Sequence, residues 1–245
     1  MRQITSDAWI ERLSGLAQLD ADDRAVALGA LGSSVSSFPA GSVLQQQQQH
    51  IVAPHLLISG WAWRTRNLPT GREQVVAIVL PGDFIGLCWR PKPRALSATV
   101  AVTKVTIRPV GGLLSIMRAE GRLNPTLREA LTLTSRHDEM RLLDHVVRLG
   151  SQPAIERVVG LFLELHARLS AVGMTTPDGF DMPLTQDQLG KMLGLSLVHV
   201  NRTLQELRRE GLLEFKQGRV TFRSREVLVR LCGFDAVAQA YAESI

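Results

Sequence analysis

The chain has 245 residues, 45% of them hydrophobic and 21% charged, which is ordinary for a soluble globular protein and long enough for two domains. Its net charge of +5 bears on partners rather than on fold. The two distant cysteines exclude a disulfide framework or a zinc-ligand cluster, and the absence of a signal-peptide pattern or of an apolar run near ~18 residues predicts a cytoplasmic protein without a membrane partner.

The first third of the chain predicts short helices followed by strands. Residues 9–31 have helical composition, and Asp20 is suited to cap the second helix. From Val35 to Pro109, short β-branched runs alternate with turns, which is typical of an all-β barrel or roll. Glycine and proline mark the turns at Pro39-Ala40-Gly41, Pro69-Thr70-Gly71 and Pro81-Gly82-Asp83. This pattern therefore predicts that residues 1–122 form a jelly-roll-like β domain with N-terminal helices.

A long helix is predicted over residues 123–150, where no Gly or Pro interrupts the interior. Asn124 can cap it, and Pro125 fits the first helical position. Its apolar stripe has two interpretations: packing on the β domain, or a dimer seam with an imperfect coiled-coil repeat. The residues of the predicted dimer interface are Leu127, Leu131, Met140, Leu143 and Val147.

The domain boundary is predicted where this long helix stops. One helix ends and another begins at Gly150-Ser151-Gln152-Pro153. Gly suits the position just after the end of the first helix, and Pro suits the first turn of the next helix. A strongly apolar helix over 153–171 and a loop follow. We expect residues 151–245 to form the second domain.

Two short helices and a turn follow over residues 185–210. Thr185-Gln186-Asp187-Gln188 fits a capping box at the start of the first helix. Gly194 can take the left-handed conformation and end that helix, and Ser196 can cap the next one. Two helices joined by a Gly-containing turn of this length are the helix-turn-helix arrangement.

The outer face of the second helix carries side chains suited to read DNA. Arg can grip guanine, and Asn or Gln can pair with adenine. Arg202 is predicted to be the principal base reader, and Leu197 and Val198 either pack on thymine methyls or fit the groove wall. His199 contacts a phosphate or caps the helix. The predicted DNA-contacting residues of this motif are Thr185, Gln186, Ser196, Leu197, Val198, His199, Asn201, Arg202, Gln205 and Arg209.

A β-hairpin is predicted over residues 212–223. Two β-rich runs flank Lys216-Gln217-Gly218-Arg219, which makes a wing beside the helix-turn-helix. Lys216 and Arg219 would contact phosphates. The 41 residues from Thr185 to Arg225 hold eight basic and four acidic residues, a net +4 of the whole +5, which favours an anionic partner.

Three blocks of the chain resemble the Crp/Fnr family of bacterial transcription regulators: FPAGSVL from Phe38, LISGWAWRTRNLPTGREQVVAIVLPGDFIGL from Leu57, and LTQDQLGKMLGLSLVHVNRTLQELRREGLLEFKQGRV from Leu184. The order of β-roll, long helix and winged helix also matches over nearly the whole length. The resemblance implies an α+β protein that forms a homodimer on the long helix and binds a two-fold symmetric site in double-stranded DNA. It also implies a sensor role for the roll and RNA polymerase as a protein partner.

The sensor departs from the pattern of family members that bind cyclic nucleotides. Those members carry Gly-Glu and Arg-Ser/Thr-Ala elements, whose Glu and Arg hold the ribose and the phosphate. Here Gly86-Leu87 and Leu96-Ser97-Ala98 stand in their places, so both charged anchors are missing. We therefore expect no cyclic nucleotide, because an unpaired phosphate in an apolar roll is costly. The candidate effector pocket comprises Gly82, Phe84, Gly86, Leu87, Cys88, Arg94, Ser97 and Ala98.

No cofactor or metal is predicted. An iron–sulfur member would need an N-terminal cysteine cluster, and none is present. Cys88 is either an oxidant sensor or an inert buried thiol. Two other functions stay open: a small-molecule receptor whose winged helix docks protein, and a cupin-like metal enzyme using His50 and His55. The charge around the winged helix argues against the first, and the spacing of the two histidines argues against the second.

Overall fold

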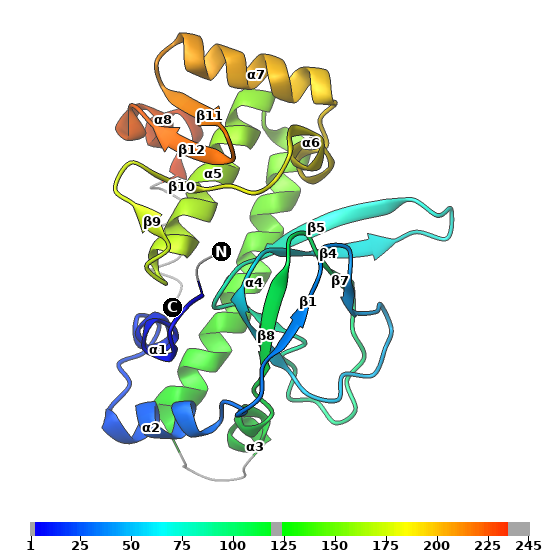
Figure 1. Ribbon diagram of the computed structural model, residues 1–245, viewed down its shortest axis with the longest axis vertical. Coiled ribbons are helices and arrows are strands. Elements are labelled where there is room, and N and C mark those ends of the chain that lie inside the picture. Colours follow the sequence, from blue (N-terminus) through cyan, green and yellow to red (C-terminus); the bar gives the residue numbers. More distant parts are fainter. Residues whose placement is uncertain (1–2, 119–123, 235–245) are drawn as a thin grey trace. The chain divides into compact units, whose positions relative to one another are not determined.

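The computed structural model describes residues 3–118 and 124–234 (Figure 1). The chain folds into two compact units, Met1–Arg141 and Leu142–Ile245. Their division falls within the long helix, earlier than the boundary expected at residues 150–151. Within the described ranges, no helix has both the length and the apolar character needed to cross a bilayer.

Two capped helices begin the first unit. In α1 (Ser6–Ser14) the Thr5 side chain accepts a hydrogen bond from the backbone of the first turn, and in α2 (Ala21–Gly29) Asp20 does the same. The cap predicted at Asp20 is therefore confirmed. Trp9 is fully buried and meets Phe84 of the roll edge-on, with ring centroids 6.1 Å apart.

The β-roll consists of two four-stranded sheets, one with the order β1-β8-β3-β6 and the other with the order β2-β7-β4-β5 (Figure 1). Side chains from both sheets, among them Leu57, Ala62 and Val105, form one buried core. A short helix, α3 (Gly112–Arg118), follows. The strands are β1 (Ser36–Phe38), β2 (Val43–Gln45), β3 (His55–Ser59), β4 (Ala62–Asn67), β5 (Glu73–Val79), β6 (Phe84–Ile85), β7 (Ala98–Ala101) and β8 (Val105–Pro109).

The long helix α4 spans Pro125–Ser151, and residue 123, its predicted first residue, lies outside the described part of the chain. Asn124 has a left-handed φ of 50°, and its amide donates to Asp22 and Asp23 of α2 over 3.3 and 3.1 Å. Further along, Arg64 of β4 donates to Asp138. Side-chain hydrogen bonds therefore connect the start of α4 to α2 and its middle to β4.

The apolar stripe of α4 divides into a buried and an exposed part. Leu127 and Leu131 are both 0% exposed within the single chain, so they cannot lie in a seam between two copies. Their assignment to the dimer interface is wrong. They pack within the chain instead, as the alternative interpretation of the stripe expected. Leu143 is 60% exposed and Val147 is 55% exposed, and Met140 is half-buried. Leu142 and Val146, which were not predicted, are exposed beside them.

The second unit is built on α5 (Ala154–Ser170), whose buried face packs on a four-stranded sheet with the order β11-β12-β10-β9. Phe162 of α5 meets Phe180 edge-on at 6.4 Å, and His166 meets Phe222 at 5.2 Å. Two of the strands, β9 (Thr175–Thr176) and β10 (Gly179–Asp181), lie in the segment expected to be a loop. The turn between them at Pro177-Asp178 carried the signal for this hairpin.

The helix-turn-helix and the wing complete this unit. The helices are α6 (Gln186–Leu193) and α7 (Leu197–Arg209), which lie side by side in Figure 1. The wing consists of β11 (Leu213–Lys216) and β12 (Arg219–Phe222), and α8 (Arg225–Cys232) follows it. The helices and the hairpin lie inside the ranges that the sequence predicts.

Candidate nucleic-acid interface

The first helix of the motif is fixed at both ends. The Thr185 hydroxyl accepts from the Gln188 backbone at 3.2 Å, and the Gln188 side chain accepts from the Thr185 backbone at 2.8 Å, so the predicted capping box is present. At the other end, Gly194 takes the left-handed conformation, with φ 63° and ψ 34°. Arg157 of α5 donates to the Leu193 carbonyl at 3.1 Å and so ties the end of α6 to the core.

The turn between the two helices passes close to Gly190 of α6. A Cβ atom there would lie 2.6 Å from the backbone oxygen of Leu195, which is shorter than real contacts allow. The Leu195 amide also donates back to the Gly190 carbonyl at 3.0 Å. Buried apolar residues fill the angle between the helices around this point. They include Leu189, Leu193, Val200, Leu204 and Leu207.

Replacing Gly190 with valine is expected to lower the free energy of unfolding of the second unit by about 1–3 kcal/mol, because the branched side chain must push the turn backbone away. Lys191→Val is the matched control, since Lys191 is exposed on the same helix and its ion pair with Asp187 is at the surface. Thermal unfolding followed by circular dichroism would measure both. Equal melting temperatures for the two variants would contradict this account of the turn.

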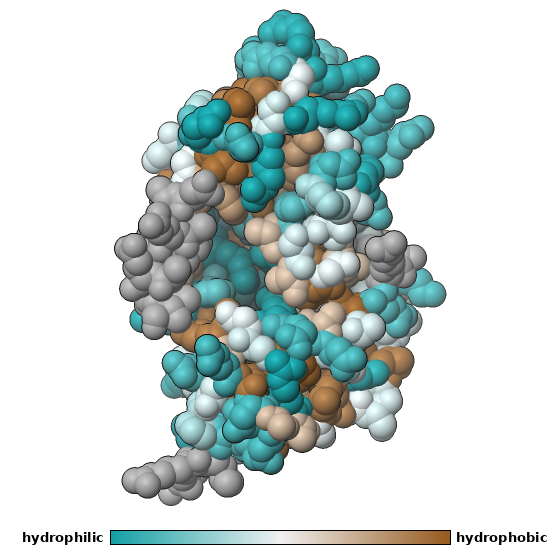
Figure 2. Space-filling model, turned by 90° about the vertical axis from the view of Figure 1, so that its left-hand side faces the viewer, coloured by the Kyte–Doolittle hydropathy of each residue, from teal (hydrophilic) through white to brown (hydrophobic). Residues whose placement is uncertain are grey.

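The recognition helix α7 is amphipathic. The Ser196 hydroxyl accepts from the His199 backbone at 3.2 Å and also lies 3.1 Å from the His199 ring nitrogen Nδ1, so this histidine takes part in the cap. Thr203 is buried with the apolar residues of the inner face. Leu197 and Val198 open the outer face and are 53% and 75% exposed. In Figure 2 the hydrophilic colour covers the top of the view, where α7 lies in Figure 1.

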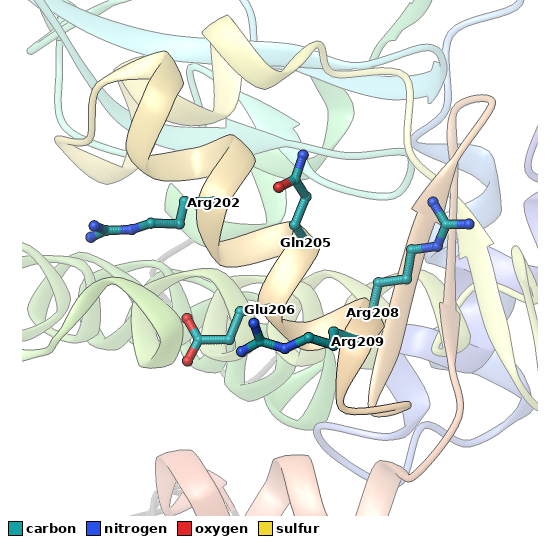
Figure 3. Close-up of a pocket in the computed structure, with 5 residues that line it drawn as sticks. All are labelled: Arg202, Gln205, Glu206, Arg208 and Arg209. Atoms are coloured by element: carbon teal, nitrogen blue, oxygen red, sulfur yellow. The ribbon is translucent and has the colours of Figure 1, made fainter.

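The rest of the outer face is positively charged and open. An open hollow of about 800 Å³ is lined by Arg202, Gln205, Glu206, Arg208 and Arg209. Figure 3 shows Arg202 extending from one side of α7 and Arg208 from the other. Within the described ranges, Arg202, Arg208 and Arg209 make no ion pair, so their guanidinium groups are available to an anionic or base-edge partner.

A row of three amides crosses from α6 to α7 beside these arginines. The Asn201 amide nitrogen donates to the Gln186 side-chain oxygen at 3.1 Å. The Gln205 amide nitrogen donates to the Asn201 side-chain oxygen at 2.9 Å. All three residues were predicted to contact DNA, and the structure brings them together; their connection was not predicted.

The two cations predicted in the wing, Lys216 and Arg219, have different surroundings. Gln217 and Gly218 form its two-residue turn with φ of 51° and 72°, so Lys216 and Arg219 face each other across the hairpin. Arg219 pairs with Asp181 at 3.2 Å and with Asp178 at 3.5 Å. It therefore serves the adjoining hairpin β9–β10, whereas Lys216 is exposed and has no ion pair in the described part of the chain.

Two carboxylates of the wing and its adjoining hairpin, Asp178 and Glu214, have a lowered pKa. A hydrogen bond from the Thr176 hydroxyl lowers the pKa of Asp178, and the nearby charges of Arg219 and Arg223 act in the same direction. On β11, the pKa of Glu214 is lowered by its hydrogen bond from Arg223. These acids offset part of the wing's positive charge, which leaves α7 as the main positive surface of the motif.

The predicted effector-pocket residues are spread over both sheets of the roll. Phe84 and Ala98 are buried but belong to different sheets, and Gly82 is buried in the turn before β6. Four others are half-buried: Gly86, Leu87, Cys88 and Ser97. Arg94 is exposed, and its guanidinium donates to the backbone oxygen of Gln48 at 2.9 Å. The one cation of the set is thus already bonded to the chain itself.

The two histidines considered as metal ligands are placed differently. His50 is exposed and pairs with Arg94 in an isolated β-bridge, whereas His55 is half-buried at the start of β3. Burial lowers the pKa of His55. Among residues 3–118 and 124–234, no group of three His, Cys, Asp or Glu side chains is placed to hold a metal ion.

Comparison with known proteins identifies the same motif and the same order of domains. Residues 156–231 match the model of the Crp-like helix-turn-helix domain. The nitrogen fixation regulation protein FixK of Azorhizobium caulinodans is 28% identical over 227 residues, which is 92% of this chain and 90% of that protein. The transcriptional activator protein FnrL of Cereibacter sphaeroides is 26% identical over 171 residues, which is 64% of this chain and 63% of that protein.

Solved structures agree with these sequence relatives. FixK2 from Bradyrhizobium japonicum superimposes with a TM-score of 0.69 and 26% identity, over 81% of this chain and 96% of that one. The Crp-family regulator TTHB099 from Thermus thermophilus superimposes with a TM-score of 0.60 and 18% identity, over 81% of this chain and 96% of that one, and shares the fold. The roll, the long helix and the winged helix therefore occur together in known proteins.

Proposed function

The chain belongs to the Crp/Fnr family of DNA-binding transcription regulators, and from this premise we propose that it acts as a homodimer on a two-fold symmetric operator without a cyclic nucleotide. The observation that carries the proposal is the outer face of α7, where Arg202, Arg208 and Arg209 are exposed and make no ion pair within the described residues. A helix of this kind fits the major groove, where arginine recognises guanine and phosphate.

Dimer formation is assigned to the second half of α4. Leu142, Leu143, Val146 and Val147 are exposed and adjacent on one face, an arrangement that a single chain leaves in water. Leu143 and Val146 have the three-residue spacing of a coiled-coil seam, and Glu139 and Gly150, which continue the spacing on either side, make the repeat imperfect. A dimer of this type needs two half-sites about one helical turn apart, roughly 34 Å along the DNA.

The roll is proposed to act without a cyclic nucleotide. Leu87 and Leu96 stand where a carboxylate and a guanidinium would be required, and Arg94 donates to the Gln48 carbonyl. Arg64 of β4 binds Asp138 of α4, so one ion pair of the chain's own residues connects the roll to α4, and Arg141 of the same helix binds the same carboxylate. The proposed regulator uses no cofactor or metal and has no catalytic activity. Its proposed protein partner is RNA polymerase.

Electrophoretic mobility shift with selected genomic fragments tests this function. We expect binding that weakens steeply as salt rises from 50 to 200 mM, because phosphate contacts release counterions. Selected fragments should share an inverted repeat, and adding cyclic AMP or cyclic GMP should leave the affinity unchanged within about twofold. A chain that ignores duplex DNA at low salt, or that binds only with added nucleotide, would contradict the proposal.

A further inference from the structure

Asn201 is held at both ends of its side chain before any DNA is present. Its amide nitrogen donates to Gln186 of α6 at 3.1 Å, and its oxygen accepts from Gln205 of α7 at 2.9 Å. We propose that Asn201 reads an adenine of the operator and that Gln186 and Gln205 are positioning residues that set its amide for this contact. The inference rests on the proposed function and deepens it.

The remaining hydrogen-bonding capacity of Asn201 decides which base it fits. A carboxamide has two N–H donors and an oxygen with two lone pairs. One donor is used by Gln186 and one lone pair by Gln205, so one donor and one acceptor remain on the same planar group. Adenine offers the complementary pair in the major groove, an N7 acceptor beside an N6 donor. Guanine offers two acceptors there and leaves the Asn201 oxygen without a donor.

The two glutamines also remove freedom that an exposed asparagine would otherwise have. Asn201 and Gln205 are exposed and Gln186 is half-buried, so in the described part of the chain it is this row of hydrogen bonds that restricts the rotation of the Asn201 amide. A side chain ordered in its binding conformation loses less entropy when the partner arrives. Gln186 begins α6 and Gln205 lies one turn beyond Asn201, so the row also connects both helices of the motif.

Gln186 accepts a hydrogen bond from Asn201, whereas Gln205 donates one to it, and this difference gives a matched pair of variants. Gln186→Glu keeps the oxygen that accepts from Asn201, whereas Gln205→Glu replaces a donor with an oxygen that repels the Asn201 oxygen. Both variants add one negative charge near DNA, so the general loss of phosphate attraction is similar in the two. Any difference in base preference between the two variants is therefore due to the hydrogen bonds among Gln186, Asn201 and Gln205.

The experiment measures affinity for operator duplexes in which each base pair is replaced in turn. The wild-type protein should prefer adenine at one position by about tenfold, the effect of one bidentate contact. Asn201→Ala and Gln205→Glu should lose this preference to within about twofold, and Gln186→Glu should keep it. Replacing that adenine with 7-deazaadenine, which lacks the N7 acceptor, should weaken the wild-type protein and not Asn201→Ala.

The outcomes separate this inference from the proposed function. A wild-type chain that binds no duplex refutes the function. Binding with an adenine preference that survives Asn201→Ala, or that is lost in Gln186→Glu and kept in Gln205→Glu, overturns only the present assignment. Gln217→Asn at the wing turn is the control, since asparagine accepts the left-handed φ of 51° there, and it should leave the preference unchanged. Melting temperatures close to the wild-type value would show that all variants fold.

Discussion

Arg202→Ala is expected to abolish the preference for the operator over random DNA while leaving weak, salt-dependent binding. Arg202 is exposed, lies beside Asn201 on the outer face of α7, and makes no ion pair in the described part of the chain. One lost guanine contact costs about 1–3 kcal/mol, a factor of roughly 5 to 150 in affinity for each half-site. Competition between operator and random duplexes in a mobility shift would measure the ratio.

Arg208→Ala is the appropriate comparison for this effect. It removes the same charge from the same helix, but Arg208 extends from another side of α7 (Figure 3). A phosphate contact there would weaken operator and random DNA alike and lower the slope of the salt dependence by about one. If Arg202→Ala behaved in the same uniform way, Arg202 would be a phosphate contact, and the reader would be another residue of α7.

Leu143→Asp is expected to convert dimers into monomers that bind operator roughly 100-fold more weakly, because a monomer loses the second half-site. Leu143 is 60% exposed in the single chain, so the aspartate costs nothing in a monomer but would be buried without a partner in a dimer. Sedimentation equilibrium would give the mass, and a mobility shift with full and half operators would give the affinity.

Two other substitutions on α4 are controls for Leu143→Asp. Thr132→Asp adds the same charge on an exposed polar part of the helix and should leave the dimer intact if the seam lies in the second half. Leu131→Asp places a carboxylate at a fully buried position and should unfold the first unit instead of dissociating it. A dimer of normal affinity from Leu143→Asp would move the interface away from Leu143.

The winged helix was predicted in detail because its signals are local. The capping box at Thr185, the left-handed Gly194 and the cap at Ser196 each act within four residues, so reading them requires no knowledge of the rest of the chain. The inner faces of α6 and α7 follow from the helical period in the same way. All three features are present where the sequence placed them.

The features that sequence reasoning missed depend on contacts between distant segments. The stripe of α4 shows which residues are apolar, but not that the chain itself covers Leu127 and Leu131 and leaves Leu142 and Val146 open. The ion pairs of Arg219 were not predicted, because Asp178 and Asp181 become its neighbours only when β10 pairs with β12. The bond between Gln186 and Asn201 likewise requires the packed angle between two helices.

If two chains pair through the exposed apolar face of α4, as proposed, the amount of the regulator itself becomes a signal. With pairing through this face as the proposed source of the active species, mass action couples assembly to the number of chains present. While most chains are single, the population of the paired form grows with the square of their total. A modest rise in synthesis would then give a larger rise in promoter occupancy, so control of its own gene's expression could stand in for a bound effector.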